Sequence, residues 1–299
     1  MIQKVFWDIT YVCNANCLYC FTDSQNDLKK MRQELEISQN KIIANHLIDN
    51  DIKKISFGGG EPFIKKDFIE LCNYINGKVN ISITSNGSIL NKDILELLEN
   101  TMIKLTISLD TINKEKFESI RRGINFNKVI ENIKELASYS KIRKRLSIRC
   151  TVTNITMQNV SDLIYFCQSL KIPKLKINTT NLFGRANLHK ELIPQFKDFQ
   201  LIIEQLKKNT DNIRNIKLEL PIQKYFGEKD DICTMGKKSF YIDPYGNVYP
   251  CAFSEGNLLI GNLLKDGYNN ITNKLNSFMH SEPQCIKCPI HRYDNNAFL

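Results

Sequence analysis

Short apolar runs alternate with longer amphipathic segments from the start of the chain to about residue 208. The runs interleave apolar and polar positions and are rich in Ile, Leu and Val, which predicts half-buried strands. These predicted strands are Lys4–Thr10, Lys54–Phe57, Asn80–Thr84, Lys104–Leu109, Leu146–Val152 and Leu175–Asn178. The longer segments place apolar residues three and four positions apart, which predicts helices. These predicted helices are Leu35–Asp49, Phe68–Ile75, Lys92–Glu99, Phe126–Ser138, Val160–Leu170 and Pro194–Lys208.

A strand followed by a helix, repeated six times, predicts an α/β fold with a parallel sheet and crossover helices. Eight such units do not fit before the pattern changes, so we expect an open, partial (β/α)6 barrel rather than a closed one. In parallel architectures of this kind, functional sites lie at the carboxyl ends of the strands.

Beyond residue 208 the pattern changes. Phe240–Ile242 and Asn247–Pro250 read as two strands, and the Pro-Tyr-Gly sequence between them suits a tight hairpin turn. A helix is expected at Tyr268–Met279. We therefore predict two domains, a partial barrel over residues 1–213 and a small α+β domain over residues 214–299.

The composition is that of an ordinary globular protein, with 42% hydrophobic and 24% charged residues. No apolar run is long enough to cross a membrane, and the first residues do not resemble a signal peptide, so a cytoplasmic protein is expected. The net charge is +9, spread mostly as Lys pairs. A solvated surface explains this charge, and an acidic or phosphorylated partner is the alternative; no nucleic-acid-binding signature is present.

Ten cysteines are the unusual feature of the composition. In a reducing compartment they are not expected to form structural disulfides. Cys13, Cys17 and Cys20 follow the first predicted strand directly, close enough together to converge on one iron–sulfur cluster. Such clusters usually take four cysteines, so one iron would remain open to another ligand. Zinc completed by a distant residue such as His46, or three buried core cysteines, are the alternatives.

Together with Gly58-Gly59-Gly60-Glu61-Pro62 after the second strand, the Cys-x3-Cys-x2-Cys loop resembles the radical S-adenosylmethionine (radical SAM) superfamily over nearly the whole chain. The resemblance implies that Cys13, Cys17 and Cys20 bind a [4Fe–4S] cluster whose open iron binds S-adenosylmethionine. It also implies reductive cleavage of that cofactor to a 5′-deoxyadenosyl radical, which abstracts hydrogen from the substrate.

The resemblance also implies residues that bind the cofactor. Gly59, Gly60, Glu61 and Pro62 would receive its amino group, although a Gly-rich turn alone is weak evidence. Ser85 and Asn86 follow the third strand, Ser108 and Asp110 end the fourth near the ribose, and Gly184 and Arg185 follow the sixth. Strand alternation points Arg149 into the barrel, where it could pair with the methionine carboxylate; a surface Arg is the alternative.

Four cysteines recur in the C-terminal segment, at Cys233, Cys251, Cys285 and Cys288. Their spacing resembles the auxiliary-cluster domain called SPASM, and we expect its short twitch form with one [4Fe–4S] cluster; structural zinc is the alternative. Cys233 could instead be a hydrogen-atom donor. Cys72, Cys150 and Cys167 lie in apolar patterns and are expected to be buried.

An auxiliary cluster favours an oxidation, because it can accept the electron left on a substrate radical. The resemblance suggests a cross-link, dehydrogenation or epimerisation of a ribosomally made peptide. A small molecule such as a sugar, aminocyclitol or nucleotide is the alternative substrate, and a non-enzymatic metal-binding or electron-transfer protein the remote one. Expected partners are an electron donor such as flavodoxin or ferredoxin and, for a peptide, a separate recognition protein.

Overall fold

The computed structural model describes residues 2–24, 33–180, 182–208, 215–220, 235–255 and 258–281. Six parallel strands form its centre, in the order that the sequence predicts. They are β1 (Lys4–Thr10), β3 (Lys54–Gly59), β4 (Asn80–Ser85), β5 (Lys104–Ser108), β7 (Leu146–Val152) and β8 (Lys174–Thr179). Each pairs in parallel with the next, which confirms the predicted partial (β/α)6 barrel.

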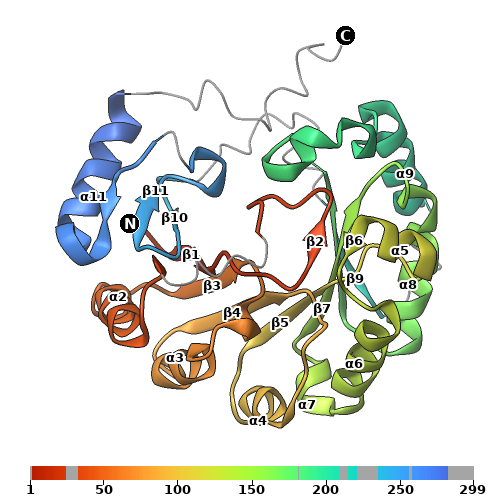
Figure 1. Cartoon of the computed structure of the whole chain (residues 1–299), viewed down its shortest axis with the longest axis horizontal. Coiled ribbons are helices and arrows are strands. Elements are labelled where there is room, and N and C mark those ends of the chain that lie inside the picture. The colour runs from red at the N-terminus through yellow and green to blue at the C-terminus, as the bar shows by residue number, and fades with distance from the viewer. Residues whose placement is uncertain are drawn as a thin grey trace.

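Helices cover the convex side of the curved sheet (Figure 1). They are α2 (Ile37–Asp49), α3 (Phe68–Ile75), α4 (Lys92–Asn100), α5 (Lys114–Ile120), α6 (Phe126–Ser138), α7 (Ser140–Arg143), α8 (Val160–Ser169) and α9 (Phe196–Lys208). The sequence pattern missed α5 and α7, which are short. Three of the eight helices, α4, α5 and α6, begin with an Asn whose side chain caps the backbone, as Asn91 does for α4.

Strand alternation explains why the helices lie on this side. Val5, Trp7 and Ile9 of β1 are at most 1% exposed and share one core with the apolar face of α2. The opposite face of the sheet is polar. There the Ser56 and Ser82 hydroxyls lie 2.9 Å apart, and Lys176 Nζ donates to Thr106 Oγ1 at 3.1 Å. The concave side is therefore lined by polar groups.

Four more strands extend the sheet at its two edges. β9 (Lys217–Glu219) pairs in parallel with β8, while β10 (Ser239–Ile242) pairs in parallel with β1. β11 (Asn247–Tyr249) and β12 (Gly261–Asn262) continue antiparallel from β10. The C-terminal hairpin is thus joined to the barrel sheet. The domain boundary between residues 213 and 214 stays a prediction, because residues 209–214 lie outside the described part.

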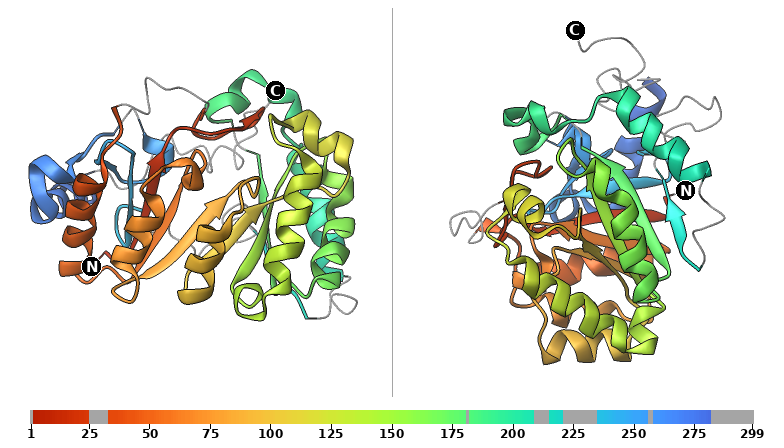
Figure 2. Two further views of the ribbon diagram at one scale, coloured as in Figure 1. Left: turned by 60° about the horizontal axis from the view of Figure 1, so that its bottom comes forward. Right: turned by 90° about the vertical axis from the view of Figure 1, so that its right-hand side faces the viewer.

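The hairpin turn is held by Asp243, whose Oδ1 accepts the backbone N–H groups of Tyr245 and Asn247 at 2.9 Å. After β12, the helix α11 (Leu263–Ser281) contains a non-helical residue at Gly267 and contacts α2. Figure 2 shows α11 and the hairpin on the α2 side of the barrel. The C-terminal segment therefore rests on the β1 edge, next to the loop that carries the first cysteines.

Short elements shape the loops at the carboxyl ends of the strands. β2 (Asn16–Cys17) and β6 (Arg121–Arg122) form a two-stranded antiparallel ladder apart from the main sheet. The 3-10 helices are η1 (Pro62–Ile64), η2 (Met157–Asn159), η3 (Gly184–Leu188), η4 (Lys190–Leu192) and η6 (Ala252–Ser254). Among the helices that the structure describes, none is both long and apolar enough to cross a membrane.

Candidate functional site

The loop after β1 carries the first three cysteines and passes over the concave side of the barrel (Figures 1 and 2). Cys13 is buried, and Cys17 and Cys20 are half-buried. The three thiols lie near enough to influence one another electrostatically. Burial raises the pKa of Cys13 to about 11 and that of Cys17 to about 12, so these thiols must lose protons to bind a metal.

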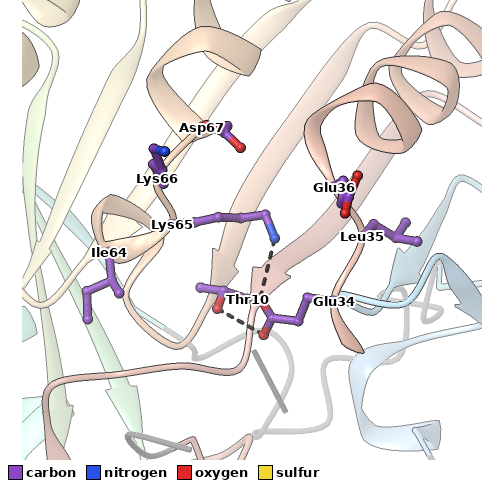
Figure 3. A pocket seen from close by; sticks show the side chains of 8 residues that line it. All are labelled: Thr10, Glu34, Leu35, Glu36, Ile64, Lys65, Lys66 and Asp67. Atoms are coloured by element: carbon purple, nitrogen blue, oxygen red, sulfur yellow. Dashed lines mark hydrogen bonds and ion pairs between the residues drawn. The ribbon is translucent and has the colours of Figure 1, made fainter. Parts of the chain in front are cut away.

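Glu34 fixes the start of this loop (Figure 3). Its Oε1 accepts hydrogen bonds from the Thr10 hydroxyl at 3.0 Å and from the backbone N–H of Tyr11 at 2.7 Å. Lys65 lies 3.4 Å from the other carboxylate oxygen, in an ion pair whose side chains are 14% and 2% exposed. The end of β1 is therefore tied both to the segment that precedes α2 and to the loop that follows β3.

Arg185 holds the far end of the loop. Its backbone N–H donates to the Cys20 carbonyl at 2.9 Å, and its guanidinium donates to the carbonyls of Cys17 and Ser24, each at 2.7 Å. It also pairs with Asp23 at 2.9 Å. Gly184 makes this approach possible: a Cβ there would lie 2.2 Å from the Phe21 carbonyl oxygen. Gly184 and Arg185 thus clamp the cysteine loop.

The Gly-rich loop after β3 lies against the other side of the cysteine loop. Gly60 N–H donates to Thr10 O at 2.7 Å, and Glu61 N–H donates to Val12 O at 2.9 Å. A Cβ on Gly60 would lie 2.1 Å from Val12 O, so no side chain fits there. Pro62 is buried at the start of η1. The two loops thus meet backbone to backbone.

Glu61 joins this loop to the next one. The fully buried carboxylate accepts hydrogen bonds from the Ser85 hydroxyl at 2.9 Å and from the Asn86 N–H at 2.7 Å. It also accepts the Phe63 N–H at 3.2 Å. Burial raises the pKa of the Glu61 carboxyl to about 7, although these hydrogen bonds act to lower it. Because protein donors already occupy both carboxylate oxygens, Glu61 fixes the position of Ser85 and Asn86, and Asn86 Nδ2 in turn lies 3.8 Å from Cys13 Sγ.

Glu61→Gln is expected to weaken S-adenosylmethionine binding roughly tenfold, about 1.4 kcal/mol, while the iron content stays unchanged. In either orientation the NH2 group of glutamine would face a backbone N–H, that of Asn86 or that of Phe63, and two facing donors would displace the loop. The binding constant is measured by titrating the reconstituted protein with the cofactor. The matched control is Glu70→Gln, which changes an exposed carboxylate paired with Lys41 and should leave binding as it is. Equal binding by both variants would contradict this role for Glu61.

Ser108 is the last residue of β5, and Asp110 follows two residues later in different surroundings. The Asp110 carboxylate is 0% exposed and receives Arg121 Nε at 2.6 Å, Arg121 Nη2 at 3.1 Å, the Thr151 N–H at 2.8 Å and the Tyr19 hydroxyl. Ser108 is half-buried and lies opposite Arg149 in the register of β5 and β7. Asp110 therefore binds the cysteine loop through Tyr19, whereas Ser108 remains on the concave side.

Arg149 lies on the concave face of β7, since its neighbours Ile148 and Cys150 are 0% exposed on the opposite face. Its Nε is buried with no hydrogen-bond partner among the described residues. Burial lowers the pKa of its guanidinium. A buried, unpaired donor of this kind fits an anionic ligand such as a carboxylate, and it is the clearest sign here that the interior is built for a cofactor.

The described C-terminal cysteine, Cys251, is buried just after β11. Near it, Phe253 packs edge-on against Phe21, with ring centroids 4.8 Å apart, and against Phe183 at 5.6 Å; Phe21 and Phe183 stack at 4.7 Å. This aromatic cluster joins the first cysteine loop to the Cys251 segment. Cys233, Cys285 and Cys288 lie outside the described residues.

The remaining cysteines behave as predicted. Cys72, Cys150 and Cys167 are 0% exposed and belong to the apolar core. None of the described cysteines forms a disulfide. Within the same residues, which include Cys13, Cys17, Cys20 and His46, no three His, Cys, Asp or Glu side chains are grouped so that they could hold a metal ion.

Several residues of the site carried no signal in the sequence pattern. Arg121, Tyr19 and Glu34 act through contacts with partners 11 to 91 positions away. The aromatic cluster likewise combines three loops. Only the Asn cap of α5, Asn113, marks the helix that delivers Arg121 to the cysteine loop.

Comparison with known proteins identifies the family. The Radical SAM superfamily model matches residues 7–167, and the model described as an iron–sulfur cluster-binding domain, SPASM, matches residues 233–289. The second match spans all four C-terminal cysteines.

Two curated relatives and one solved structure resemble nearly the whole chain. The antilisterial bacteriocin subtilosin biosynthesis protein AlbA of Bacillus subtilis (strain 168) is 26% identical over 308 residues, 98% of this chain and 66% of AlbA. Mycofactocin maturase MftC of Mycolicibacterium smegmatis is 26% identical, covering 94% of this chain and 74% of MftC. Streptococcus suis SuiB, bound to its precursor peptide SuiA, shares the fold with a TM-score of 0.76 at 17% identity, over 91% of this chain and 64% of SuiB. The chain thus spans about two thirds of the length of AlbA and of SuiB. With more than half of its residues matched by the family model, the chain belongs to the radical SAM superfamily.

Proposed function

We propose that this chain is a radical SAM enzyme that oxidatively modifies a ribosomally made peptide. One observation carries the proposal: the three-cysteine loop passes over the concave side of the six-stranded barrel and meets the Gly-rich loop backbone to backbone. Cys13, Cys17 and Cys20 would hold a [4Fe–4S] cluster with one iron free of protein ligands. When bound, the cluster and S-adenosylmethionine supply the 5′-deoxyadenosyl radical that takes a hydrogen atom from the substrate.

The protein side chains would bind and orient the cofactor. The backbone at Gly59 and Gly60 would receive its amino group, and Arg149 would pair with its carboxylate through the unpartnered Nε. Ser85, Asn86 and Ser108 offer polar groups at the ends of β4 and β5. Glu61, Asp110 and Arg185 are engaged with the protein itself, so their contribution would be to hold the surrounding loops in place.

The C-terminal cysteines Cys233, Cys251, Cys285 and Cys288 would hold one auxiliary [4Fe–4S] cluster, as in the short twitch form. A second cluster favours an oxidative outcome, because it can accept an electron. The Phe21, Phe183 and Phe253 cluster supports this assignment, since it fixes the Cys251 segment against the first cysteine loop.

Changing Cys251 and Cys288 together to alanine is expected to remove roughly half of about eight iron atoms per chain. It should stop product formation and leave some cofactor cleavage, because the N-terminal loop keeps its three thiols. Iron analysis and chromatography of 5′-deoxyadenosine measure both effects. An unchanged iron content would contradict this ligand assignment.

A peptide is the substrate class that the relatives favour. AlbA is named for biosynthesis of a bacteriocin, MftC for maturation of mycofactocin, and SuiB is bound to a precursor peptide. We further propose that flavodoxin or ferredoxin supplies electrons, and that a separate protein could present the peptide.

The test is anaerobic reconstitution with iron and sulfide, followed by incubation with S-adenosylmethionine, dithionite and a short peptide encoded beside the gene. Mass spectrometry should show loss of two hydrogen atoms, as in a cross-link or a dehydrogenation. Deuterium uptake from heavy water without loss of hydrogen would instead indicate an epimerisation, which is not an oxidation. Cofactor cleavage without any change in the peptide, but with oxidation of a sugar or nucleotide, would refute the peptide assignment. Bound zinc with no cleavage would refute the enzyme itself.

A further inference from the structure

The concave side of the barrel carries an excess of positive charge. On the six central strands and on β9, the residues of this side alternate with the apolar residues that form the core. The basic residues at these positions are Lys4, Lys54, Lys104, Arg149, Lys174, Lys176 and Lys217, and the acidic ones are Asp8 and Glu219. Along these strands, basic side chains therefore far outnumber carboxylates.

Most of this charge is not neutralised within the barrel. The Glu219 carboxylate lies 3.3 Å from Lys174 Nζ, in a partly exposed ion pair. The Asp8 carboxylate accepts a hydrogen bond from the Tyr241 hydroxyl at 2.9 Å. Within the described part of the chain, no ion pair is formed by the half-buried cations Lys54, Arg149 and Lys176.

Lys176 lies next to the proposed cofactor site. It is opposite Arg149 in the register of β7 and β8, and neighbouring strands lie about 4.8 Å apart. Its Nζ donates to Thr106 Oγ1 at 3.1 Å, which uses one of the three donors of an ammonium group. Burial and the charge of Arg149 lower the pKa of Lys176 to about 8, and an anion beside it would stabilise its charged form.

Lys54 approaches the same region from another part of the sheet. Three strands separate β3 from β8, yet Lys54 and Lys174 lie near enough to repel each other. Burial and the charges of Lys104 and Lys174 lower the pKa of Lys54. The curvature of the sheet therefore brings lysines of distant strands toward one another.

We propose that Lys54 and Lys176 bind acidic side chains of the peptide substrate and so place the residue to be modified beside the cofactor. Like charges that repel one another destabilise a fold, and a half-buried cation attracts a carboxylate more strongly than an exposed one does. Lysines are compact point charges, and here they are spread over several strands. This arrangement suits carboxylates along a peptide better than a single phosphate group, which an arginine fork binds best.

This inference rests on the proposed function and names the substrate class as an acidic peptide. The test measures binding rather than turnover. A fluorescently labelled form of the peptide encoded beside the gene is titrated with the reconstituted full chain and S-adenosylmethionine, and its polarisation is recorded. Each Asp or Glu of the peptide is changed in turn to the amide, and a further form carries an amidated C-terminus, which separates side-chain carboxylates from the terminal one.

The protein variant is Lys54→Met/Lys176→Met, which removes both charges and keeps long side chains. The matched control is Lys92→Met/Lys134→Met, which removes two exposed lysines from α4 and α6 on the convex side. If the first double variant does not fold, Lys176→Met alone takes its place.

In the parent, at least one change of a peptide Asp or Glu to the amide should weaken binding roughly tenfold. The same change should have little effect in Lys54→Met/Lys176→Met, because the lysine that recognises the carboxylate is gone, whereas the control should behave as the parent does. Binding that depends on no side-chain carboxylate, or that depends on the terminal one alone, overturns the inference. So does equal discrimination by the parent and by Lys54→Met/Lys176→Met.

A parent protein that binds no form of the peptide would instead refute the peptide assignment of the proposed function. Succinate at constant ionic strength then tests the anion site separately. It should raise the midpoint of thermal unfolding of the parent and of the control, but not that of Lys54→Met/Lys176→Met. An equal rise in all three proteins would show that these lysines bind no carboxylate.

Discussion

Changing Cys17 to alanine is expected to remove the iron held by the N-terminal loop and to abolish 5′-deoxyadenosine formation. Cys17 is the central thiol of the motif, and its backbone is fixed on both sides, by Arg185 at its carbonyl and by the ladder with Arg121. No neighbouring thiol can take its place without breaking these contacts. The variant should keep about half of its iron, at the C-terminal cysteines.

The matched control for this experiment is Cys72→Ala. Cys72 is 0% exposed on α3 and packs only in the core, so its loss should lower stability without changing iron content or cofactor cleavage. Iron analysis and chromatography of the nucleoside products compare the two variants. A Cys17→Ala protein with the full iron content and the parent activity would show that the loop does not bind the cluster.

Changing Gly184 to alanine should have the second largest effect, although it removes no polar group. A Cβ at this position would lie 2.2 Å from the Phe21 carbonyl oxygen and 2.4 Å from that of Cys20. Both are backbone atoms of the cysteine loop, so the loop must move away, and the hydrogen bonds of Arg185 are lost with it. The protein should fold but incorporate much less iron at its N-terminal site.

Gly77→Ala separates this effect from backbone strain. Gly77 has φ of 78° and Gly184 has φ of 57°, so alanine is strained at both, by about 1–2 kcal/mol. However, nothing lies within 4 Å of a Cβ at Gly77. Thermal unfolding should therefore show the cost of backbone strain alone in Gly77→Ala and a larger loss of stability in Gly184→Ala, and only Gly184→Ala should lose iron. Equal iron contents would mean that the close approach of the two loops is unimportant.

The fold could be predicted because its signal is local. Alternation within Lys4–Thr10 and Leu146–Val152 gave the bounds of β1 and β7 as the structure has them, and Phe68–Ile75 gave those of α3. The hairpin around Asp243–Gly246 is also present. Its pairing with β1 could not be foreseen, because parallel pairing between β10 and β1 depends on residues more than 230 positions apart.

The candidate site was only partly predictable, for a related reason. The positions of Cys13, Gly60 and Arg149 at the concave side follow from strand ends and alternation. The contacts of Glu61 and Asp110 do not follow from the sequence. Both residues were predicted to touch the cofactor, and both carboxylates accept hydrogen bonds from donors in other loops. Their assignment to cofactor binding stays a prediction. Side chains that bind loops to one another leave no periodic pattern in the sequence.

The most direct test of the central claim is electron–nuclear double resonance on the reduced protein with S-adenosylmethionine labelled at its amino nitrogen and its carboxylate. If Cys13, Cys17 and Cys20 hold a cluster with one open iron, both labels should show hyperfine coupling to it, and the coupling should disappear in Cys17→Ala. A reduced cluster in this loop that couples to neither label would contradict an open iron, and with it the proposed activity.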